Sequence, residues 1–355
     1  MRLKRLSALG LACVIAAGVT LTGCGSVDPE ATVATINGRE IPLGVANFAA
    51  QFTAVDYDTY YLSYLGTDMW SQDIGGNGET MTDSVKNNIL ETLEEYCLLD
   101  QHMGDYGVEL TEEELADIES AAAQFIADNS AQALEALGAT EEYVSEFLRL
   151  NTLQSKMRAA MVADVDRNVP DEECAQKTFS YVRVSKAADS DDEEQTEEQA
   201  AAAAKETAEK ILTAAMTGSQ EDALEAAAED ADKNKSTCSY GTGDLNEEDN
   251  STSLELEVLQ AADKLDEGEF AKELVETDDS YYIVRMDSLF DEDATEKERQ
   301  SIISERENDR YEEIVNGYKE TSDWTVNEDV WEPVNFATIY TKAQSQTDTN
   351  ETVGE

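Results

Sequence analysis

Histidine is almost absent from this sequence of 355 residues, which contains only one, His102. Metal centres and catalytic triads rely on histidine as a ligand or a base, so the sequence has little material for either chemistry. We therefore expect no metal and no cofactor. His102 stands near the expected C-terminal end of a helix, where the helix dipole stabilises a basic side chain, and we interpret it as a structural residue.

Cysteine is scarce as well, with five residues in the chain. Cys13 and Cys24 lie in the N-terminal segment. Cys97, Cys174 and Cys238 then remain as an odd set without the spacing of a metal site, and they do not indicate a disulfide framework. Cys97 falls within a helical pattern, where a free cysteine usually packs as a small apolar residue.

Basic residues are few, because 25 lysines and arginines stand against 78 aspartates and glutamates, for a formal net charge of −53. Such a chain repels nucleic acid and anionic lipid head groups, so neither is expected as a partner. The charge favours solubility, and it also creates a surface that attracts cations or basic polypeptides. With 41% hydrophobic residues, the chain still has enough apolar material for the cores of two domains.

Residues 1–23 have the form of a signal peptide. Three basic residues precede an apolar run, 6–21, that is too short and too rich in alanine and glycine for a membrane-spanning helix. The segment Leu21-Thr22-Gly23-Cys24 resembles the bacterial lipobox, in which the cysteine carries diacylglycerol and becomes the first residue after cleavage. We therefore predict a lipid anchor on Cys24, a tether over 24–32, and a location on the outer face of the cytoplasmic membrane. An ordinary signal peptide with a cysteine at its cleavage site is the alternative.

The region that follows the tether is predicted to be mostly helical. Alternating residues over 31–36 indicate a short strand, and Asn37-Gly38 is a strong signal for a tight turn. Apolar residues at spacings of three and four then predict a helix over 43–65. Further helices are expected up to about residue 165.

Capping residues indicate where these later helices begin. Thr82 or Asp83 is expected to cap a helix that ends near residue 103. Thr111 and Glu114 form a capping box, since each side chain can satisfy an unpaired backbone amide of the other residue. The helix that starts there is expected to turn Leu115 inward, together with Ile118, Ala122 and Phe125.

The pattern changes after residue 170, where strands alternate with helices. Strands are predicted at 179–184, 236–240 and 280–286, and helices at 198–216, 220–229 and 254–265. The acidic run 189–198 is expected to be a solvated loop. This composition predicts a small α+β domain inserted between helical segments.

The C-terminal part of the chain begins with a charged helix over 295–318. Its apolar face is narrow, so other helices must cover it. Strands are expected at 324–326 and within 331–336. The tail over 337–355 lacks core residues and is expected to be disordered.

Four motifs, in this order, resemble the parvulin-type extracytoplasmic foldases, the group that contains the PrsA lipoproteins of Gram-positive bacteria and the SurA chaperone of Gram-negative bacteria. The opening 33–41 resembles the strand and turn that begin the helical chaperone domain of that family. Residues 241–245, Gly-Thr-Gly-Asp-Leu, resemble the Gly-Gly-Asp-Leu-Gly turn of the parvulin domain. Residues 265–269 resemble its Leu-x-x-Gly-Glu motif, and 277–284 resemble its last strand.

The resemblance implies an α+β protein with two domains. A SurA-like helical chaperone domain would combine 33–172 with 291–336, and a parvulin-like domain would occupy 178–290. The implied function is that of a lipid-anchored foldase or chaperone that assists the folding of secreted proteins, with unfolded or partly folded polypeptides as partners.

The sequence departs from the family at the catalytic histidines of the parvulin domain. Tyr181 and Tyr282 stand where parvulins carry these histidines, and Asp263 falls near a position that is usually aromatic. The prolyl isomerase is therefore expected to be weak or inactive; an active isomerase that uses the two tyrosines is the alternative. The degenerate site that the resemblance implies comprises Tyr181, Ser236, Val258, Asp263, Asp279 and Tyr282.

The helical region supplies aromatic residues for contact with clients. Non-native polypeptides bind to apolar and aromatic surface, and an acidic rim keeps such a surface from self-association. Ordinary helix core is the alternative explanation for these residues, and a solute-binding lipoprotein with two lobes around a cleft is an alternative for the whole chain. The client-binding candidates are Phe48, Phe52, Tyr57, Tyr60, Tyr61, Tyr64 and Trp70.

Overall fold

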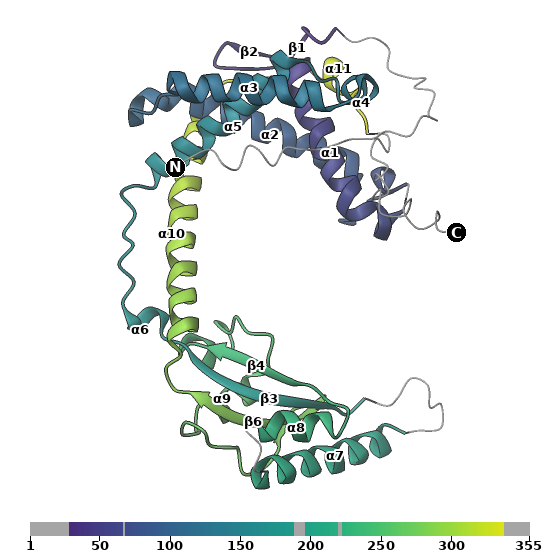
Figure 1. The fold of residues 1–355 in the computed structure, drawn as a ribbon, viewed down its shortest axis with the longest axis vertical. Coiled ribbons are helices and arrows are strands. Elements are labelled where there is room, and N and C mark those ends of the chain that lie inside the picture. The colour runs from purple at the N-terminus through teal and green to yellow at the C-terminus, as the bar shows by residue number, and fades with distance from the viewer. Residues whose placement is uncertain (1–27, 67, 188–195, 219–221, 337–355) are drawn as a thin grey trace, which may run out of the picture. The chain divides into compact units, whose positions relative to one another are not determined.

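The computed structural model describes residues 28–66, 68–187, 196–218 and 222–336 (Figure 1). The described residues form two compact units: the first contains those up to Asp164 and from Asp309 onward, and the second covers Val165–Asn308. We call them the helical unit and the sheet unit. Helices predominate and the sheets are small and antiparallel, so the predicted α+β class is confirmed. Cys24, most of the predicted acidic loop and the predicted tail lie outside the described residues.

The helical unit opens with a hairpin of β1 (Thr32–Ile36) and β2 (Arg39–Pro42). Asn37 and Gly38 connect the strands with positive φ angles of 50° and 81°, as the Asn-Gly signal predicts. The sequence predicted that this turn leads directly into a helix, so the second strand, β2, was not predicted. On its other side, β1 pairs with β7 (Trp324–Val326), which gives the strand order β2-β1-β7.

Helices make up the rest of this unit. They are α1 (Leu43–Leu65), α2 (Met81–His102), α3 (Glu112–Asp128), α4 (Ala131–Leu137), α5 (Glu141–Met161) and α11 (Glu328–Trp331), with short 3-10 helices at Met69–Ser71 and Met103–Tyr106. One core joins α1, α2, α3, α4 and α5 with the hairpin and with residues 331–336. The predicted limits of α1 are confirmed, and α1 ends where Gly66 takes a positive φ of 84°.

Two of the helix starts test the capping predictions. At the start of α3, the Thr111 hydroxyl accepts the backbone N–H of Glu114, whose side chain accepts the N–H of Thr111, so the capping box is confirmed. At the start of α2, the prediction of Thr82 or Asp83 as the cap is wrong. Thr80 is the cap and Asp83 completes its capping box. The Thr82 hydroxyl donates instead to a carbonyl of the preceding 3-10 helix.

Two other predictions in this unit are wrong. Leu115 is exposed, because α3 packs through Ile118, Ala122 and Phe125, which begin one turn later. Residues 331–336 contain no strand: Trp331 ends the short helix α11 and is buried. Both errors concern long-range packing, which alternation and spacing of apolar residues do not define.

The predicted charged helix is α10 (Glu292–Thr321), which extends beyond the predicted 295–318 at both ends. In the helical unit Tyr311 and Val315 are buried, and the Tyr311 hydroxyl donates to Glu95 Oε1 at 2.6 Å. The predicted need for covering helices is met there by α2 and α5, since Gln154 of α5 also contacts the Tyr311 hydroxyl.

The sheet unit contains four antiparallel strands in the order β4-β3-β6-β5. The elements are α6 (Asp171–Cys174), β3 (Lys177–Ser185), α7 (Glu197–Thr217), α8 (Ala223–Glu229), β4 (Lys235–Tyr240), a 3-10 helix at Gly243–Leu245, α9 (Leu256–Ala262), β5 (Val275–Glu276) and β6 (Ser280–Ser288). The three predicted strands are therefore present. The helix expected over 254–265 is limited to α9.

Each face of this sheet has its own core. Val182, Val184 and Ile283 pack on one face against α7 and α8. Successive strand residues point to opposite faces, so Phe179 and Tyr282 lie on the other face, against α9. Tyr181, Val258 and Tyr282 of the predicted degenerate site lie on this second face. No helix in the described parts of the chain is long and apolar enough to span a membrane.

Candidate functional sites

Tyr181 and Tyr282 come together on the α9 face of the sheet. Tyr181 lies on β3 and Tyr282 on the neighbouring strand β6, with ring centroids 5.8 Å apart and an interplanar angle of 51°. Tyr282 is buried and Tyr181 is half-buried. The sequence motifs had suggested this pair, and the antiparallel pairing of the strands brings the two rings into contact.

The hydroxyl of Tyr282 is hydrogen-bonded to a carboxylate. It donates to Glu255 Oε2 at 2.8 Å, while Thr277 donates to Glu255 Oε1 at 3.2 Å. Burial and this hydrogen bond both raise the pKa of Tyr282. Burial also raises the pKa of Glu255, but hydrogen bonds from its own backbone, Tyr282 and Thr277 outweigh it and keep that pKa below its usual value. A neutral tyrosine and an ionised glutamate therefore form a stable pair near neutral pH.

The remaining predicted residues of this site are spread around it. Val258, on α9, is fully buried among core residues. Asp263 accepts from Lys177 Nζ at 2.7 Å and from the Tyr240 hydroxyl at 3.2 Å. Its charge is thus paired at the end of α9.

Two predicted residues lie on the surface of the sheet unit. Ser236 stands opposite Tyr181 in the pairing of β4 with β3, and it is exposed. Asp279 is exposed just before β6, where its carbonyl accepts the N–H of Lys186 at 2.8 Å. Asp279 makes no contact with Tyr282 among the hydrogen bonds of the described residues. Glu255 was not among the predicted residues, because no local sequence pattern marks it as the partner of a tyrosine on another element.

Comparison with known proteins gives matches among solved structures only. No protein family and no curated sequence matches this chain. Solved foldase structures are similar to it. The foldase protein PrsA from Lactococcus lactis is 19% identical over 86% of this chain and 100% of its own, with a TM-score of 0.37.

Two other PrsA structures are similar in the same way. The protein from Streptococcus pneumoniae is 16% identical, over 76% of this chain and 98% of its own, with a TM-score of 0.30. The protein from Bacillus subtilis is 14% identical, over 86% of this chain and 98% of its own, with a TM-score of 0.25. They belong to the group that the sequence motifs resemble. At such scores the similarity transfers neither an activity nor a residue role to this chain.

The seven client-binding candidates in the helical unit fall into three groups. Phe48 and Trp70 are buried, and Phe48 is the centre of an aromatic cluster with Phe125 and Phe147 at 5.8 and 5.6 Å. Phe52 and Tyr57 are half-buried. The remaining three are exposed by 68%, 47% and 85%: Tyr60, Tyr61 and Tyr64.

Tyr60, Tyr61 and Tyr64 form what we call the tyrosine surface, at the C-terminal end of α1. Residues three and four apart are neighbours on a helix, so Tyr64 lies beside the other two. Trp70 anchors this end of the helix: its Nε1 donates to Asp58 Oδ1 at 3.0 Å, and its ring packs against Tyr57. The tyrosine surface is thus exposed on an anchored helix.

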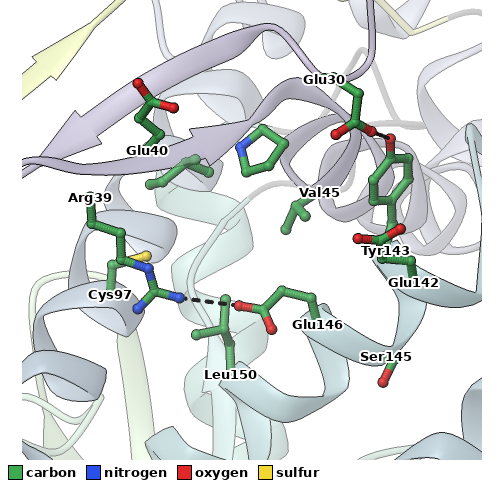
Figure 2. Close-up of a pocket in the computed structure, with 12 residues that line it drawn as sticks. Glu30, Arg39, Glu40, Val45, Cys97, Glu142, Tyr143, Ser145, Glu146 and Leu150 are labelled. Atoms are coloured by element: carbon green, nitrogen blue, oxygen red, sulfur yellow. Dashed lines mark hydrogen bonds and ion pairs between the residues drawn. The ribbon is translucent and has the colours of Figure 1, made fainter.

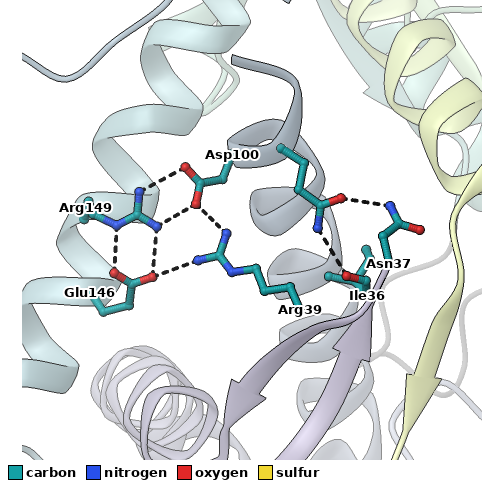
Figure 3. A network of polar contacts seen from close by, with 7 residues as sticks. Ile36, Asn37, Arg39, Asp100, Glu146 and Arg149 are labelled. Carbon is teal, nitrogen blue, oxygen red and sulfur yellow. Dashed lines mark hydrogen bonds and ion pairs between the residues drawn. The ribbon is translucent and has the colours of Figure 1, made fainter. Parts of the chain in front are cut away.

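A network of charged side chains lies elsewhere in the helical unit (Figure 3). Asp100 of α2 accepts from Arg149 Nη1 and Nη2 of α5 at 3.0 and 2.8 Å, and also from Arg39 of β2. Glu146 accepts from Arg149 Nε at 2.7 Å and from Arg39 Nη2 at 3.2 Å. The network ties β2 to two helices. Throughout the described ranges, no three histidine, cysteine, aspartate or glutamate side chains are arranged to hold a metal ion.

Proposed function

We propose that this chain is a lipid-anchored foldase or chaperone that holds unfolded segments of secreted polypeptides on the outer face of the cytoplasmic membrane. The observation that carries the proposal is the tyrosine surface, three neighbouring aromatic side chains that protrude from an otherwise acidic chain. Exposed aromatic patches with polar surroundings are typical of surfaces that bind other polypeptides.

The size of the tyrosine surface fits transient binding. A client that covers about 100 Å² on each tyrosine would gain about 7 kcal/mol in total, at about 25 cal/mol per Å² of apolar surface. Association and the ordering of a flexible client consume most of that gain. The net affinity is therefore weak, as a chaperone that must release its client requires.

In this proposal the sheet unit is a weak or inactive prolyl isomerase. An isomerase must lower a rotational barrier of about 20 kcal/mol and needs an apolar pocket for the proline ring. Three observations support inactivity: the Tyr282 hydroxyl is bonded to Glu255, Val258 is buried in the core, and Asp263 is paired with Lys177.

The lipid anchor and the domain limits are part of the same proposal. Cys24 is the proposed attachment point, on the strength of the lipobox-like segment. The proposed chaperone domain combines 33–172 with 291–336, and the proposed parvulin-like domain covers 178–290. Removal of 178–290 should therefore leave client binding intact.

The antiparallel sheets argue against the solute-binding alternative. A protein of that class has lobes in which helices alternate with the strands of a mainly parallel sheet. Among the residues that the structure describes, both sheets are small and their strand pairs are antiparallel.

The proposal can be tested with an aggregation assay on an unfolded client. Wild type should delay aggregation, and a variant with serine at Tyr60, Tyr61 and Tyr64 should lose most of that effect. The matched control has phenylalanine at the same positions, which retains the aromatic surface and should act like wild type. Equal protection of the client by the serine and phenylalanine variants would rule out the tyrosine surface as the client-binding site.

A prolyl peptide assay on the same proteins examines the isomerase alternative. We expect little turnover by wild type. Fast turnover that disappears in Tyr181→Ala and Tyr282→Ala, with folding intact, would make the active isomerase the correct function.

A further inference from the structure

A cavity of about 380 Å³ lies in the helical unit between β2 and the first half of α5 (Figure 2). This volume falls within the range of ligand-binding pockets. All four residues of β2 line the cavity, and β2 is an edge strand of its sheet. The cavity therefore runs beside a strand edge with no strand paired to it in the described sheet.

Hydrogen bonds between β1 and the chain around β7 show which way the backbone of β2 points. Asn37 N–H, just after β1, donates to Asp323 C=O, and Val33 C=O within β1 accepts from Asn327 N–H, so the odd-numbered residues of β1 face β7. The even-numbered residues then face β2, because backbone groups alternate in direction along a strand. Ile36 is paired with Arg39, and the next pair joins Thr35 to Glu40.

It follows that the backbone N–H and C=O of Glu40 point away from β1, toward the free edge. In Figure 2 the carboxylate of Glu40 is directed away from the other side chains of the cavity. Its backbone is thus the part of Glu40 that faces the cavity. A free N–H and C=O on one residue can bond an added extended chain, as in peptide recognition by strand addition.

The side chains of the cavity combine an apolar wall with excess negative charge. Ile41, Val45 and Leu150 provide the apolar wall. The only basic side chain that lines the cavity is Arg39, and Asp100 and Glu146 already bind its guanidinium.

Glu142 and Glu30 also line the cavity. Glu30 accepts a hydrogen bond from the Tyr143 hydroxyl, which does not neutralise its charge. Glu142 is exposed on the first turn of α5. A ligand with an aliphatic stem and a cationic end would match both the apolar wall and these carboxylates.

We propose that this cavity is a subsite for a lysine or arginine side chain of an extended polypeptide that adds to β2 through the backbone of Glu40. The inference rests on the proposed function, since the polypeptide would be a segment of an unfolded client. The net charge of −53 complements a basic segment. The cavity site is separate from the tyrosine surface in its residues and in the chemistry that it recognises.

Binding can be measured by fluorescence anisotropy with the soluble chain that begins after Cys24. The probe is a labelled nine-residue peptide of alternating threonine and valine with one central lysine, compared with the same peptide carrying norleucine. Wild type should bind the lysine peptide up to about fivefold more tightly, the range of an exposed ion pair. Glu142→Gln should remove most of this preference and leave the norleucine affinity unchanged.

A second pair of variants tests strand addition. Glu40→Pro removes the outward N–H at an edge position where proline is tolerated, and we expect about tenfold weaker binding of both peptides, the loss of one good hydrogen bond. Glu40→Gln retains the N–H and changes only a side chain that points away, so it should bind like wild type. If Glu40→Pro fails to fold, a peptide with its backbone amides methylated replaces it and should bind wild type about tenfold more weakly.

Several results would refute the proposed subsite. These are equal affinity of wild type for the two peptides, a full lysine preference in Glu142→Gln, or equal binding by Glu40→Pro and Glu40→Gln. The serine variant of the tyrosine surface separates the two proposals, because it should still bind the lysine peptide. Peptide binding without any client protection by wild type would refute the proposed function and leave the subsite standing.

Discussion

Replacement of Asp100 by asparagine should strongly destabilise the helical unit. The carboxylate of Asp100 is only 12% exposed and bonds both Arg39 and Arg149, whose side chains are 33% and 23% exposed. Asparagine has nearly the same shape but no charge, so the two guanidinium groups would share a single carboxylate, that of Glu146.

The expected loss is about 2–3 kcal/mol. Hydrogen bonds to charged groups contribute about 1.5–3 kcal/mol, and removal of one partner from a buried ion pair costs about 3–5 kcal/mol. We take a value below the second range, because a third of the Arg39 side chain is in water and Glu146 remains as a partner. With an m-value of about 2 kcal/mol per M urea, the unfolding midpoint should fall by about 1 M or slightly more.

Tryptophan fluorescence is a suitable signal for this measurement. The three tryptophans of the chain, Trp70, Trp324 and Trp331, all belong to the helical unit. The control is Glu91→Gln, which removes an exposed carboxylate from the same helix and should change the free energy of unfolding by less than about 0.5 kcal/mol. An Asp100→Asn midpoint equal to that of the control would refute the assigned role of the network.

The pH dependence provides a second check. Burial raises the pKa of Asp100, but hydrogen bonds from Arg149 and Arg39 outweigh it and hold the pKa below its ordinary value of 3.8. A carboxylate whose pKa is lower in the folded than in the unfolded state stabilises the fold. Its contribution is fully present above the pKa of the unfolded state, and it is lost as the pH falls through the pKa of the folded state. The difference between wild type and Asp100→Asn should therefore be the same at pH 7 and pH 5, and shrink below pH 3.8.

Three further predictions concern single residues. Tyr282→Phe removes the bond to Glu255, so it should destabilise the sheet unit by about 1–2 kcal/mol without loss of client protection, as measured by urea unfolding and the aggregation assay. Burial raises the pKa of the Cys97 thiol to about 11, so maleimide should modify it at pH 8 only after unfolding; rapid modification of Cys97 in the native chain, located by peptide mapping, would contradict the structure. Cys24→Ser should abolish acylation and either release the protein from the membrane or leave its signal uncleaved, and continued incorporation of labelled lipid would disprove the anchor.

Local interactions explain which parts of the fold could be predicted. The Thr111–Glu114 capping box and the Asn37-Gly38 turn depend on hydrogen bonds and φ angles within four residues, so a short stretch of sequence determines them. The limits of α1 follow from its apolar spacing and from Gly66, which accepts a positive φ at the end of the helix. Three of the four strands of the sheet unit, β3, β4 and β6, were likewise predicted from short runs of residues, whereas the two-residue strand β5 was not.

The predictions that failed have different causes. Thr80, and not Thr82, caps α2 through a capping box with Asp83 that is as local as the box at Thr111, so the sequence contained this signal. Trp331 belongs to a helical turn that packs into the core of the helical unit, although its neighbours alternate like a strand. This segment had two locally acceptable structures, and packing selected one of them.

The candidate sites show the same division between local and tertiary information. The sequence alone determined that the chain is acidic and that α1 carries an aromatic series. That Tyr181 and Tyr282 stand where parvulins carry histidines was a prediction from the resemblance of motifs. Only the tertiary structure decided that Phe48 is core while Tyr64 is exposed, since both have helical spacing and differ in what packs against them.

The tertiary structure also decided which charges meet. Arg39, Asp100 and Arg149 come from β2, α2 and α5, and the partner of Tyr282 is Glu255, just before α9. Distances between such residues depend on how the elements pack, whereas periodicity and capping depend on neighbours along the chain. The sequence could therefore identify the elements and their residue types, and the fold was needed to bring those residues into a network, an exposed surface and a cavity.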